Sequence, residues 1–506
     1  MKSLRTMAIV AILFIVLAGV TVTVTSNFQR TFSPGASCGS SRGVTDARSA
    51  KGDEDAGLVV TPDRYASDIA CRVLADGGSA ADAVVAAQFT LGLTEPQSSG
   101  PGGGAVAVYY DAATDHVRRW NAAVPAPRDG GNLTGVPQTP QLMRTMQDDY
   151  GVLDFDAVLA SVAELAEDGF AASGRLTGAL DRRVDVLDGM PWPGVDAQDL
   201  PRAGDVLTNP DYAAYLRDLD VTGRIEPEAP LCTGYRDHQV CGSGSTGTGM
   251  MVVGEALGIL DRADVGDDLR HVVTEAERLA LANGNTWMQD PEVDPGLSEA
   301  YVDSLVTDPG HLQQQADRID PDATLGYIEP DPLVGTEGTY LPNLEEGTSQ
   351  ITVRDGHGSI ASVTTTLHQH FGSGVLRDGY FLNNSLNNFS AGSKSINQRA
   401  PGVRPKTAMS PVIVFGDGEP VLALGSPGGG AIPSYVIKTI VGFVDEGMSA
   451  RDAVDAPNYG ATGRDATYIE EPGVGHDSGL SVISREGRYF RAEADERAGG
   501  TARAAG

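Results

Sequence analysis

A Gly-Thr pair just before a predicted strand, Gly347-Thr348, constrains the fold of this chain more than any other feature of the sequence. The pair follows an acidic, loop-like run at 343–346 and precedes two strand-like runs at 351–353 and 359–366. Glycine allows a strained backbone at such a junction, and the threonine hydroxyl can attack the carbonyl that precedes it. If that bond breaks, Thr348 becomes an N-terminal residue that carries both a nucleophile and its own amine base. The alternative is an ordinary turn into a strand, and the rest of the sequence has to distinguish the two.

The remainder of the chain alternates predicted helices with predicted strands. Apolar residues at helical spacing predict helices over 64–75, 79–93, 155–168, 270–283, 432–447 and 450–455. Short apolar runs predict strands over 57–60, 105–110, 412–415, 420–424 and 479–483. Strands at both ends of the chain around central helices favour a layered α/β fold in which helices cover the sheets.

A glycine run at 102–104 precedes the predicted strand at 105–110. Phosphate-binding loops open a helix instead and end in Gly-Lys-Ser/Thr, which this run lacks. Glycine also permits another backbone to come very close. The run therefore indicates close backbone approach, to a site or to another strand.

The chain is strongly acidic. Its 37 Lys and Arg against 68 Asp and Glu give a formal net charge of −31 over 506 residues. Such a surface repels nucleic acid and anionic membrane, so nucleic-acid partners are excluded. The acidic residues are spread along the sequence, which favours a solvated surface over a localised interaction tail.

The N-terminus predicts export. Lys2 and Arg5 precede an apolar run at 8–24, the pattern of a signal peptide or of a retained signal-anchor over residues 1–25. Either one predicts a protein that is secreted or lies on the outer face of the cytoplasmic membrane, in the second case through an N-terminal membrane anchor. Residues 26–56 are rich in Ser, Gly and charge, and predict a linker.

Four cysteines fit an exported protein. Cys232 and Cys241 flank a short hairpin-like segment, which predicts a disulfide between them. Cys38 and Cys71 either pair with each other, or Cys71 is buried in a helix and Cys38 is free. No CxxC motif or Cys/His grouping in the sequence indicates a metal site.

Several motifs, taken in chain order, resemble those of the gamma-glutamyltransferase family of N-terminal-nucleophile hydrolases. They are Ala75-Asp76-Gly77-Gly78-Ser79-Ala80-Ala81-Asp82-Ala83, Glu95-Pro96-Gln97-Ser98-Ser99-Gly100, Gly347-Thr348, Thr364-Thr365-Thr366-Leu367, Leu382-Asn383-Asn384, Met409-Ser410-Pro411 and Gly425-Ser426-Pro427-Gly428-Gly429. Each is weak alone, but together they are specific, and they cover almost the whole chain from residue 57 onward.

The resemblance implies an α/β fold, a four-layered αββα sandwich made as one precursor. It implies self-cleavage between Gly347 and Thr348, with a large-subunit part at 57–347 and a small-subunit part at 348–506. In the family the two cleaved subunits stay associated and form one catalytic unit. The family uses no cofactor and no metal, so none is expected here.

The same resemblance assigns catalytic roles. Thr348 attacks an amide carbonyl, and its freed α-amine, with a pKa of about 8, accepts the proton. Thr366 matches the family threonine that positions the nucleophile. The backbone N–H groups of Gly428 and Gly429 match the oxyanion hole, whose donors each contribute about 10²–10³ in rate. For these two glycines the alternative is a tight turn.

The residues that hold glutamate in the family differ in this sequence. Asn121 occupies the place of the arginine that binds the substrate α-carboxylate, and Asn388 that of the aspartate that binds the α-amine. His368 replaces a family asparagine, and Thr407-Ala408 replace paired serines. Charge-assisted contacts are stronger than neutral ones. Either neighbours such as His368, His370 or Arg399 supply substitute contacts, or the acyl donor is not an ordinary γ-glutamyl amino acid. The second explanation is favoured.

The sequence therefore predicts a self-processing amidohydrolase or acyltransferase for a small-molecule or polymeric amide, with γ-glutamyl compounds as the default donor. A glutaryl- or cephalosporin-type acylase and a poly-γ-glutamate capsule depolymerase are alternatives. The connection at 390–405 is short for the family, which favours an open cleft and a bulky donor. An alternative outside the enzymes is a non-catalytic binding protein that kept the fold, which would also explain the altered pocket.

Overall fold

The structure is a computed structural model. It describes residues 38, 47–130, 134–184, 192, 195–196, 198–244, 248–290, 292–293, 301, 303–332, 346–390, 396–465, 468–470 and 478–505. The predicted signal segment at 1–25 lies outside these residues, as does the linker up to residue 46 apart from Cys38. Within the described part of the chain, helices long and apolar enough to span a bilayer are absent.

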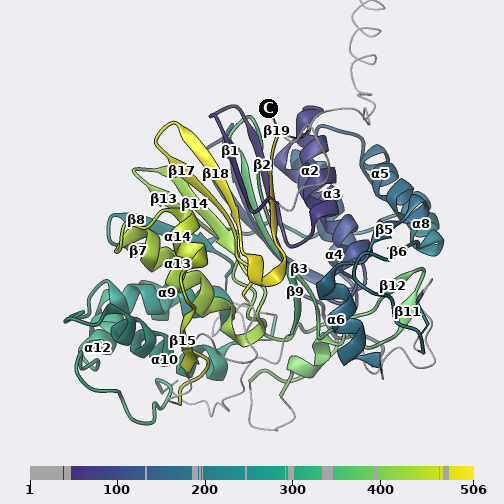
Figure 1. The fold of residues 1–506 in the computed structure, drawn as a ribbon. Coiled ribbons are helices and arrows are strands. Elements are labelled where there is room, and N and C mark those ends of the chain that lie inside the picture. Colours follow the sequence, from purple (N-terminus) through teal and green to yellow (C-terminus); the bar gives the residue numbers. More distant parts are fainter. Residues whose placement is uncertain are drawn as a thin grey trace, which may run out of the picture.

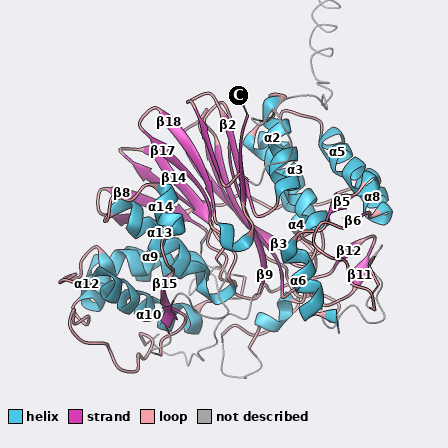
Figure 2. Cartoon of the chain, in the orientation of Figure 1, coloured by secondary structure: helices cyan, strands magenta, loops and turns pink. Residues whose placement is uncertain are grey.

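Two antiparallel sheets, stacked face to face, form the centre of the molecule (Figures 1 and 2). The six-stranded sheet contains, in spatial order, β19 (Thr501–Ala505), β2 (Gly57–Thr61), β9 (Gly347–Arg354), β10 (Ile360–His368), β3 (Gly104–Asp111) and β4 (His116–Ala122). The seven-stranded sheet contains β1 (Ser49–Gly52), β18 (Tyr489–Ala494), β17 (Ser481–Glu486), β14 (Glu419–Gly425), β13 (Val412–Gly416), β8 (His238–Gly242) and β7 (Leu231–Tyr235).

Helices cover the outer face of each sheet, which gives the predicted four-layered αββα sandwich (Figure 2). On the six-stranded side lie α2 (Arg64–Ala75), α3 (Ala80–Thr94), α4 (Thr139–Tyr150), α5 (Phe155–Asp168), α6 (Gly174–Arg182) and α8 (Pro210–Arg217). On the seven-stranded side lie α9 (Thr248–Leu260), α10 (Leu269–Trp287), α12 (Pro309–Ala316), α13 (Ile432–Val444) and α14 (Ala450–Asp455). The sequence-based prediction of the fold class is confirmed.

Helix α3 shows how the sequence builds a layer. All fifteen of its residues are buried because it packs between the sheet and the neighbouring helices. Ser79 and Asp82 form a capping box: the Ser79 hydroxyl accepts the Asp82 N–H, and the Asp82 carboxylate accepts the Ser79 N–H. The buried Asp82 carboxylate also accepts hydrogen bonds from the Gln147 side chain at 2.6 Å and from the Val152 N–H at 3.0 Å. This polar anchor fixes the small, apolar helix against its neighbours.

Shorter elements complete the chain. They are β5 (Phe170–Ala171), β6 (Val206–Leu207), β11 (Leu376–Arg377), β12 (Tyr380–Phe381), β15 (Tyr459–Ala461), β16 (Tyr468–Glu470) and the 3₁₀ turns η1 (Ser385–Asn388), η2 (Gly429–Ala431) and η3 (Glu496–Ala498).

Strand β1 corrects one sequence-based prediction. Residues 49–52 fall in the predicted linker, yet they pair with β18 in register Ser49↔Glu493 to Gly52↔Phe490. The run Ser-Ala-Lys-Gly has no apolar alternation of its own, so the edge of the sheet creates this strand by supplying backbone partners.

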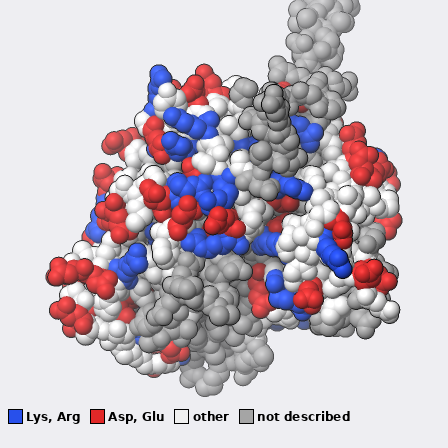
Figure 3. Space-filling view, in the orientation of Figure 1, with Lys and Arg blue, Asp and Glu red and all other residues white. Residues whose placement is uncertain are grey.

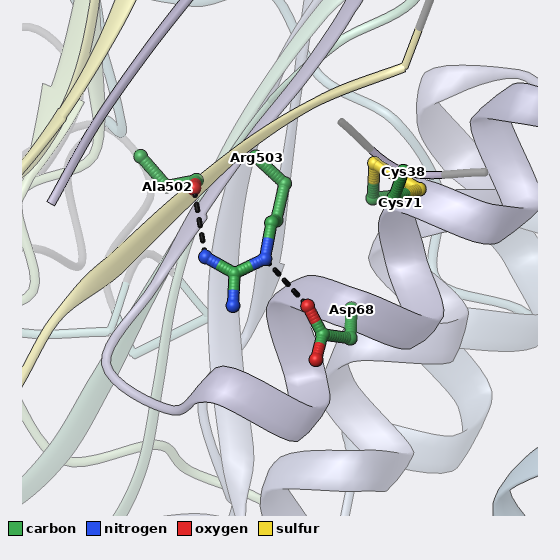
Figure 4. Close-up of a disulfide and its surroundings, with 5 residues drawn as sticks. All are labelled: Cys38, Asp68, Cys71, Ala502 and Arg503. Carbon is green, nitrogen blue, oxygen red and sulfur yellow. Dashed lines mark hydrogen bonds and ion pairs between the residues drawn. A yellow bond between two sulfur atoms is a disulfide. The ribbon is translucent and has the colours of Figure 1, made fainter. Parts of the chain in front are cut away.

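All four cysteines form disulfides. Cys232 and Cys241 join β7 to β8, as predicted. Cys38 pairs with Cys71 on α2, which decides between the two alternatives that the sequence leaves open (Figure 4). Next to this bond, Arg503 of β19 donates to Asp68 of α2 at 2.5 Å. The N-terminal segment and the last strand are thus both fastened to α2.

Candidate active site

The predicted nucleophile lies at the start of β9, opposite the end of β10. Thr348 and Thr366 are register partners on these strands. The Thr348 hydroxyl donates to Thr366 Oγ1 at 3.3 Å, and the Thr366 hydroxyl donates to the carbonyl oxygen of Gly347. The His368 N–H donates to the same Thr366 oxygen at 2.8 Å. Thr366 therefore uses its one donor and both acceptor positions, and it joins the Thr348 hydroxyl to the carbonyl of the bond predicted to break.

A β-bulge creates this arrangement. The register of β9 and β10 shifts between Thr366 and His368, so that Gly347 pairs with His368 instead of Leu367. His368 adopts a φ of 81°, a left-handed conformation that is uncommon for residues other than glycine. Bulges re-aim backbone and side chains locally. Here the bulge brings the His368 N–H onto the Thr366 oxygen.

The glycine run at 102–104 lies against the same strand end. A Cβ atom on Gly103 would sit 2.3 Å from the carbonyl oxygen of Thr366, and one on Gly102 would sit 2.0 Å from the carbonyl oxygen of Phe381. Any side chain at either position would force the backbones apart. The predicted close backbone approach is confirmed, and it occurs next to the candidate nucleophile.

A buried charged group lies behind Thr348, on the helix side of the sheet. Arg175, near the start of α6, donates from Nη2 to the carbonyl oxygen of Thr348 at 3.1 Å and from Nη1 to Glu95 Oε2 at 2.6 Å. The Ser349 hydroxyl also donates to Glu95, at 3.2 Å. Burial raises the pKa of Glu95 to about 7, although Arg175 opposes the rise. Glu95 is thus poised to gain or lose a proton near neutral pH.

Sequence reasoning did not single out Glu95 or Arg175. Glu95 is the first residue of the family motif at 95–100, and this motif is the only local sign that it belongs to the site. Arg175 stands 173 residues before Thr348, and nothing in its own neighbourhood distinguishes it from other helical arginines.

Three predicted residues line one small cavity. Thr366, Asn388 and Thr407 surround it together with Lys406, and its volume is about 10 Å³, room for about one water molecule. The Asn388 amide donates to the carbonyl oxygen of Lys406 at 3.2 Å. Thr348 itself has no exposed surface. In the uncut chain, therefore, no substrate of the size of an amino acid reaches the nucleophile.

The other predicted binding residues lie apart from this cavity. Asn121 accepts the Ala123 N–H on its side-chain oxygen at 3.0 Å and lines a separate hollow of about 810 Å³. Ala408 is buried, and its carbonyl oxygen accepts the Ser410 hydroxyl at 2.8 Å. His368 is also buried, and burial lowers the pKa of its imidazole to about 4. His368 is therefore neutral at physiological pH.

The candidate oxyanion turn follows β14. Gly425, at the end of that strand, packs directly on Gln350 of β9, where an added Cβ would come within 2.3 Å of the Gln350 side-chain oxygen. Gly428 and Gly429 then take φ values of 133° and 59°. At Gly428 a Cβ would also meet the Tyr435 ring at 2.4 Å. Within the described part of the chain, no hydrogen bond joins this turn to Thr348 before the bond is cut.

One group of side chains has the composition of a metal site. Ligand atoms of Glu255, His311 and Asp331 lie within 4.8 Å of one another on the seven-stranded side. Asn283 donates to both carboxylates, at 2.7 Å and 3.0 Å, and His311 contacts Glu255 at 2.9 Å. Hydrogen bonds thus already engage one oxygen of each carboxylate, Oε1 of Glu255 and Oδ2 of Asp331. His368 and His370, next to the candidate nucleophile, do not belong to this group.

Comparisons with known proteins identify the family of this chain. The family model described as Gamma-glutamyltranspeptidase matches residues 66–227 and 224–504. The glutathione hydrolase proenzyme of Bacillus subtilis subsp. natto is 27% identical over 510 residues, covering 86% of this chain and 85% of that protein. The glutathione hydrolase proenzyme of Escherichia coli (strain K12) is 26% identical over 486 residues, covering 80% of each.

Solved structures show the same fold. The crystal structure of cephalosporin acylase from Bacillus halodurans superposes with a TM-score of 0.77 at 21% identity, covering 93% of this chain and 98% of that one. At this identity the likeness concerns the fold alone.

Proposed function

The chain belongs to the gamma-glutamyltranspeptidase family, and from this premise we propose that it is a self-processing amidohydrolase or acyltransferase whose nucleophile is Thr348. The hydrogen-bond chain from the Thr348 hydroxyl through Thr366 to the Gly347 carbonyl carries the proposal. These hydrogen bonds connect the Thr348 hydroxyl, through Thr366, to the carbonyl of the peptide bond that precedes it, and they give that carbonyl a donor. Intramolecular cleavage needs its reacting groups held together in this way.

The first proposed reaction is the cut itself. The Thr348 oxygen adds to the Gly347 carbonyl carbon, and the Thr366 hydroxyl donates to the oxygen that gains negative charge. The C–N bond then breaks, the Thr348 nitrogen takes the proton lost by the hydroxyl, and an ester joins Gly347 to the Thr348 side chain. Water hydrolyses the ester. The products are a carboxylate at Gly347 and an N-terminal Thr348, in two subunits that stay associated.

The second proposed reaction is acyl transfer. The freed α-amine of Thr348, with a pKa of about 8, takes the hydroxyl proton. The oxygen attacks an amide carbonyl, the α-ammonium gives its proton to the leaving nitrogen, and the C–N bond breaks. Water or an amine acceptor then attacks the acyl-enzyme ester and releases the acyl group. Gly428 and Gly429 are the proposed oxyanion donors. They come from the loop after β14, which packs on β9 through Gly425 and Gln350.

The acyl group is proposed to occupy the cavity lined by Thr366, Asn388 and Thr407. That cavity is too small in the uncut chain, so the cut has to displace the residues ahead of Thr348 before a donor enters. Neutral side chains at Asn388 and His368 favour a donor that does not rely on an ionic contact there. Asn121 and Ala408 are proposed to act indirectly, through the backbone of the segments that line the cavity. The two disulfides fit an extracytoplasmic protein.

N-terminal sequencing of purified protein tests the cut. We expect two bands on a denaturing gel, the smaller beginning at Thr348. A single uncut band that persists after prolonged incubation would refute the proposal. A panel of γ-glutamyl anilide, glutaryl anilide and poly-γ-glutamate then distinguishes the default donor from the acylase and depolymerase alternatives. The glutaryl compound is the second candidate, because the sequence analysis leaves a glutaryl- or cephalosporin-type acylase open. Turnover of any of them excludes a non-catalytic binding protein.

A further inference from the structure

A second hollow, of about 620 Å³, lies beside the candidate nucleophile and is lined by arginines. Among the residues around it are Arg48, Arg64, Arg175, Arg182 and Arg497. In a chain with a net charge of −31, a concentration of guanidinium groups in one cavity is unexpected. The cavity that contains Thr366, Asn388 and Thr407 shares no lining residue with this hollow.

Neighbouring carboxylates neutralise only part of this charge. Arg48 pairs with Asp455 and with Glu496, and Arg497 pairs with Asp495. Arg64 and Arg182 are different, because within the described part of the chain neither lies within ion-pair distance of a carboxylate. The Arg64 guanidinium lies over the ring of Tyr65.

Arg175 contributes a third positive charge, and it forms an ion pair with Glu95. Because burial raises the pKa of Glu95 to about 7, this carboxyl is only partly ionised near neutral pH and balances Arg175 incompletely. The positive charges of these arginines also act on the neighbouring His370. Burial lowers the pKa of its imidazole to about 4, and the charges of Arg175, Arg182 and Arg183 add to the effect.

Two helix N-termini border the hollow. At α2 the Asp63 carboxylate already accepts from the Tyr65 and Ala66 N–H groups, so this end adds no positive potential. At α6 the capping group is the neutral Ser173 hydroxyl, and a helix N-terminus without an anionic cap attracts anions. Figure 3 shows basic side chains gathered near the middle of the drawn face, interleaved with acidic ones, over the region where the yellow turn η3 lies in Figure 1.

Arg175 connects this hollow to the reaction centre. The same guanidinium lines the hollow and donates to the Thr348 carbonyl oxygen at 3.1 Å. We propose that the hollow is an anion subsite, which binds a carboxylate on the leaving-group side of the scissile amide, with Arg64 and Arg182 as its main contacts. This inference rests on the proposed function, in which the acyl group occupies the other cavity.

A pair of chromogenic donors tests the subsite. γ-Glutamyl-3-carboxy-4-nitroanilide and γ-glutamyl-4-nitroanilide differ only by a carboxylate on the leaving group. We expect kcat/KM to favour the carboxylated donor in the wild-type chain. The double variant Arg64→Gln/Arg182→Gln should lower the ratio of the two kcat/KM values about three- to tenfold, the range for two exposed charge contacts. The ratio is insensitive to partial misfolding, because misfolding lowers both rates alike.

Arg488→Gln is the matched control. It removes the same charge from an exposed position at the turn between β17 and β18, outside the hollow, and should leave the ratio unchanged. An unchanged ratio in the double variant, or an equal fall in the control, overturns the subsite. If the wild-type chain turns over neither anilide, the γ-glutamyl donor is excluded, while the proposed function still stands on the cut and on the other donors of the panel. Calorimetric titration with tricarballylate, a tricarboxylate without an amide, then tests the hollow alone. Binding that the double variant does not weaken overturns the inference.

Discussion

Replacing Thr366 by valine tests the proposed cleavage chemistry most directly. Valine keeps the shape of threonine but removes the hydroxyl. Three hydrogen bonds disappear together: the donation to the Gly347 carbonyl and the two accepted from the Thr348 hydroxyl and the His368 N–H. Thr366 has only 4% of its surface exposed, so water does not replace them.

The valine variant should change both the rate of the cut and the stability of the fold. The lost donor to the Gly347 oxygen resembles the loss of one oxyanion donor and should slow the cut about 10²–10³-fold. The unpaired Thr348 hydroxyl and His368 N–H should each cost about 1–3 kcal/mol of folding stability. The slowing therefore exceeds what a modest loss of stability alone produces, provided that the measurement is made well below the melting temperature.

The assay follows the uncut chain on a denaturing gel after purification and fits its decay. Circular dichroism melting of the same samples separates stability from rate. Thr366→Ser is the control, because serine restores the hydroxyl and should cut at a rate within about tenfold of the wild type. If the valine variant cuts as fast as the wild type while remaining folded, Thr366 does not act on the Gly347 carbonyl and the reasoning fails.

Four further outcomes are expected. Thr348→Ala should abolish both the cut and amide turnover, whereas Thr348→Ser should retain a measurable cut, which a gel and an anilide assay report. The raised pKa of Glu95 means that the folded chain binds a proton that the unfolded chain releases between about pH 4.5 and pH 7. Folding stability should fall across this window, by on the order of 3 kcal/mol from this group, and urea unfolding of Glu95→Gln should show a smaller fall. Cys38→Ser opens a loop closed over 33 residues and should cost about 3–4 kcal/mol of stability, read as a lower melting temperature. His368→Asn restores one family residue beside Thr366. It should fold with a melting temperature close to that of the wild type, because Asn tolerates the left-handed backbone found there.

Local signals predicted the elements that depend on local chemistry. The helix expected at 155–168 is α5 (Phe155–Asp168), and the one at 450–455 is α14 (Ala450–Asp455). Both begin after a side chain that caps the first turn, Asp154 and Ser449, and such caps are visible in sequence. Helix α13 ends at Val444, three residues before the predicted end at 447.

Features that depend on distant partners were not predictable in the same way. Strand β1 exists because β18 offers an edge, and the contact of Arg175 with Thr348 joins residues 173 positions apart. The bulge at His368 arises from the pairing of two strands, so its left-handed backbone leaves no local sign. The motifs located Thr348 and Thr366. They could not show that Thr348, the proposed nucleophile, is fully buried in the uncut chain.

The contacts around Thr348 divide into those that the cut removes and those that it leaves. The bond between Thr366 and the Gly347 carbonyl belongs to the scissile peptide, so it is lost when Gly347 departs. The Arg175 contact is to Thr348's own carbonyl, which is not part of that peptide. We therefore expect Arg175, with Glu95 behind it, to hold the proposed nucleophile both before and after the cut. Thr366 changes role: its hydroxyl, released from Gly347, becomes free to donate to the Thr348 oxygen or to accept from the new α-amine. The same threonine pair can then serve two successive reactions without rebuilding the site.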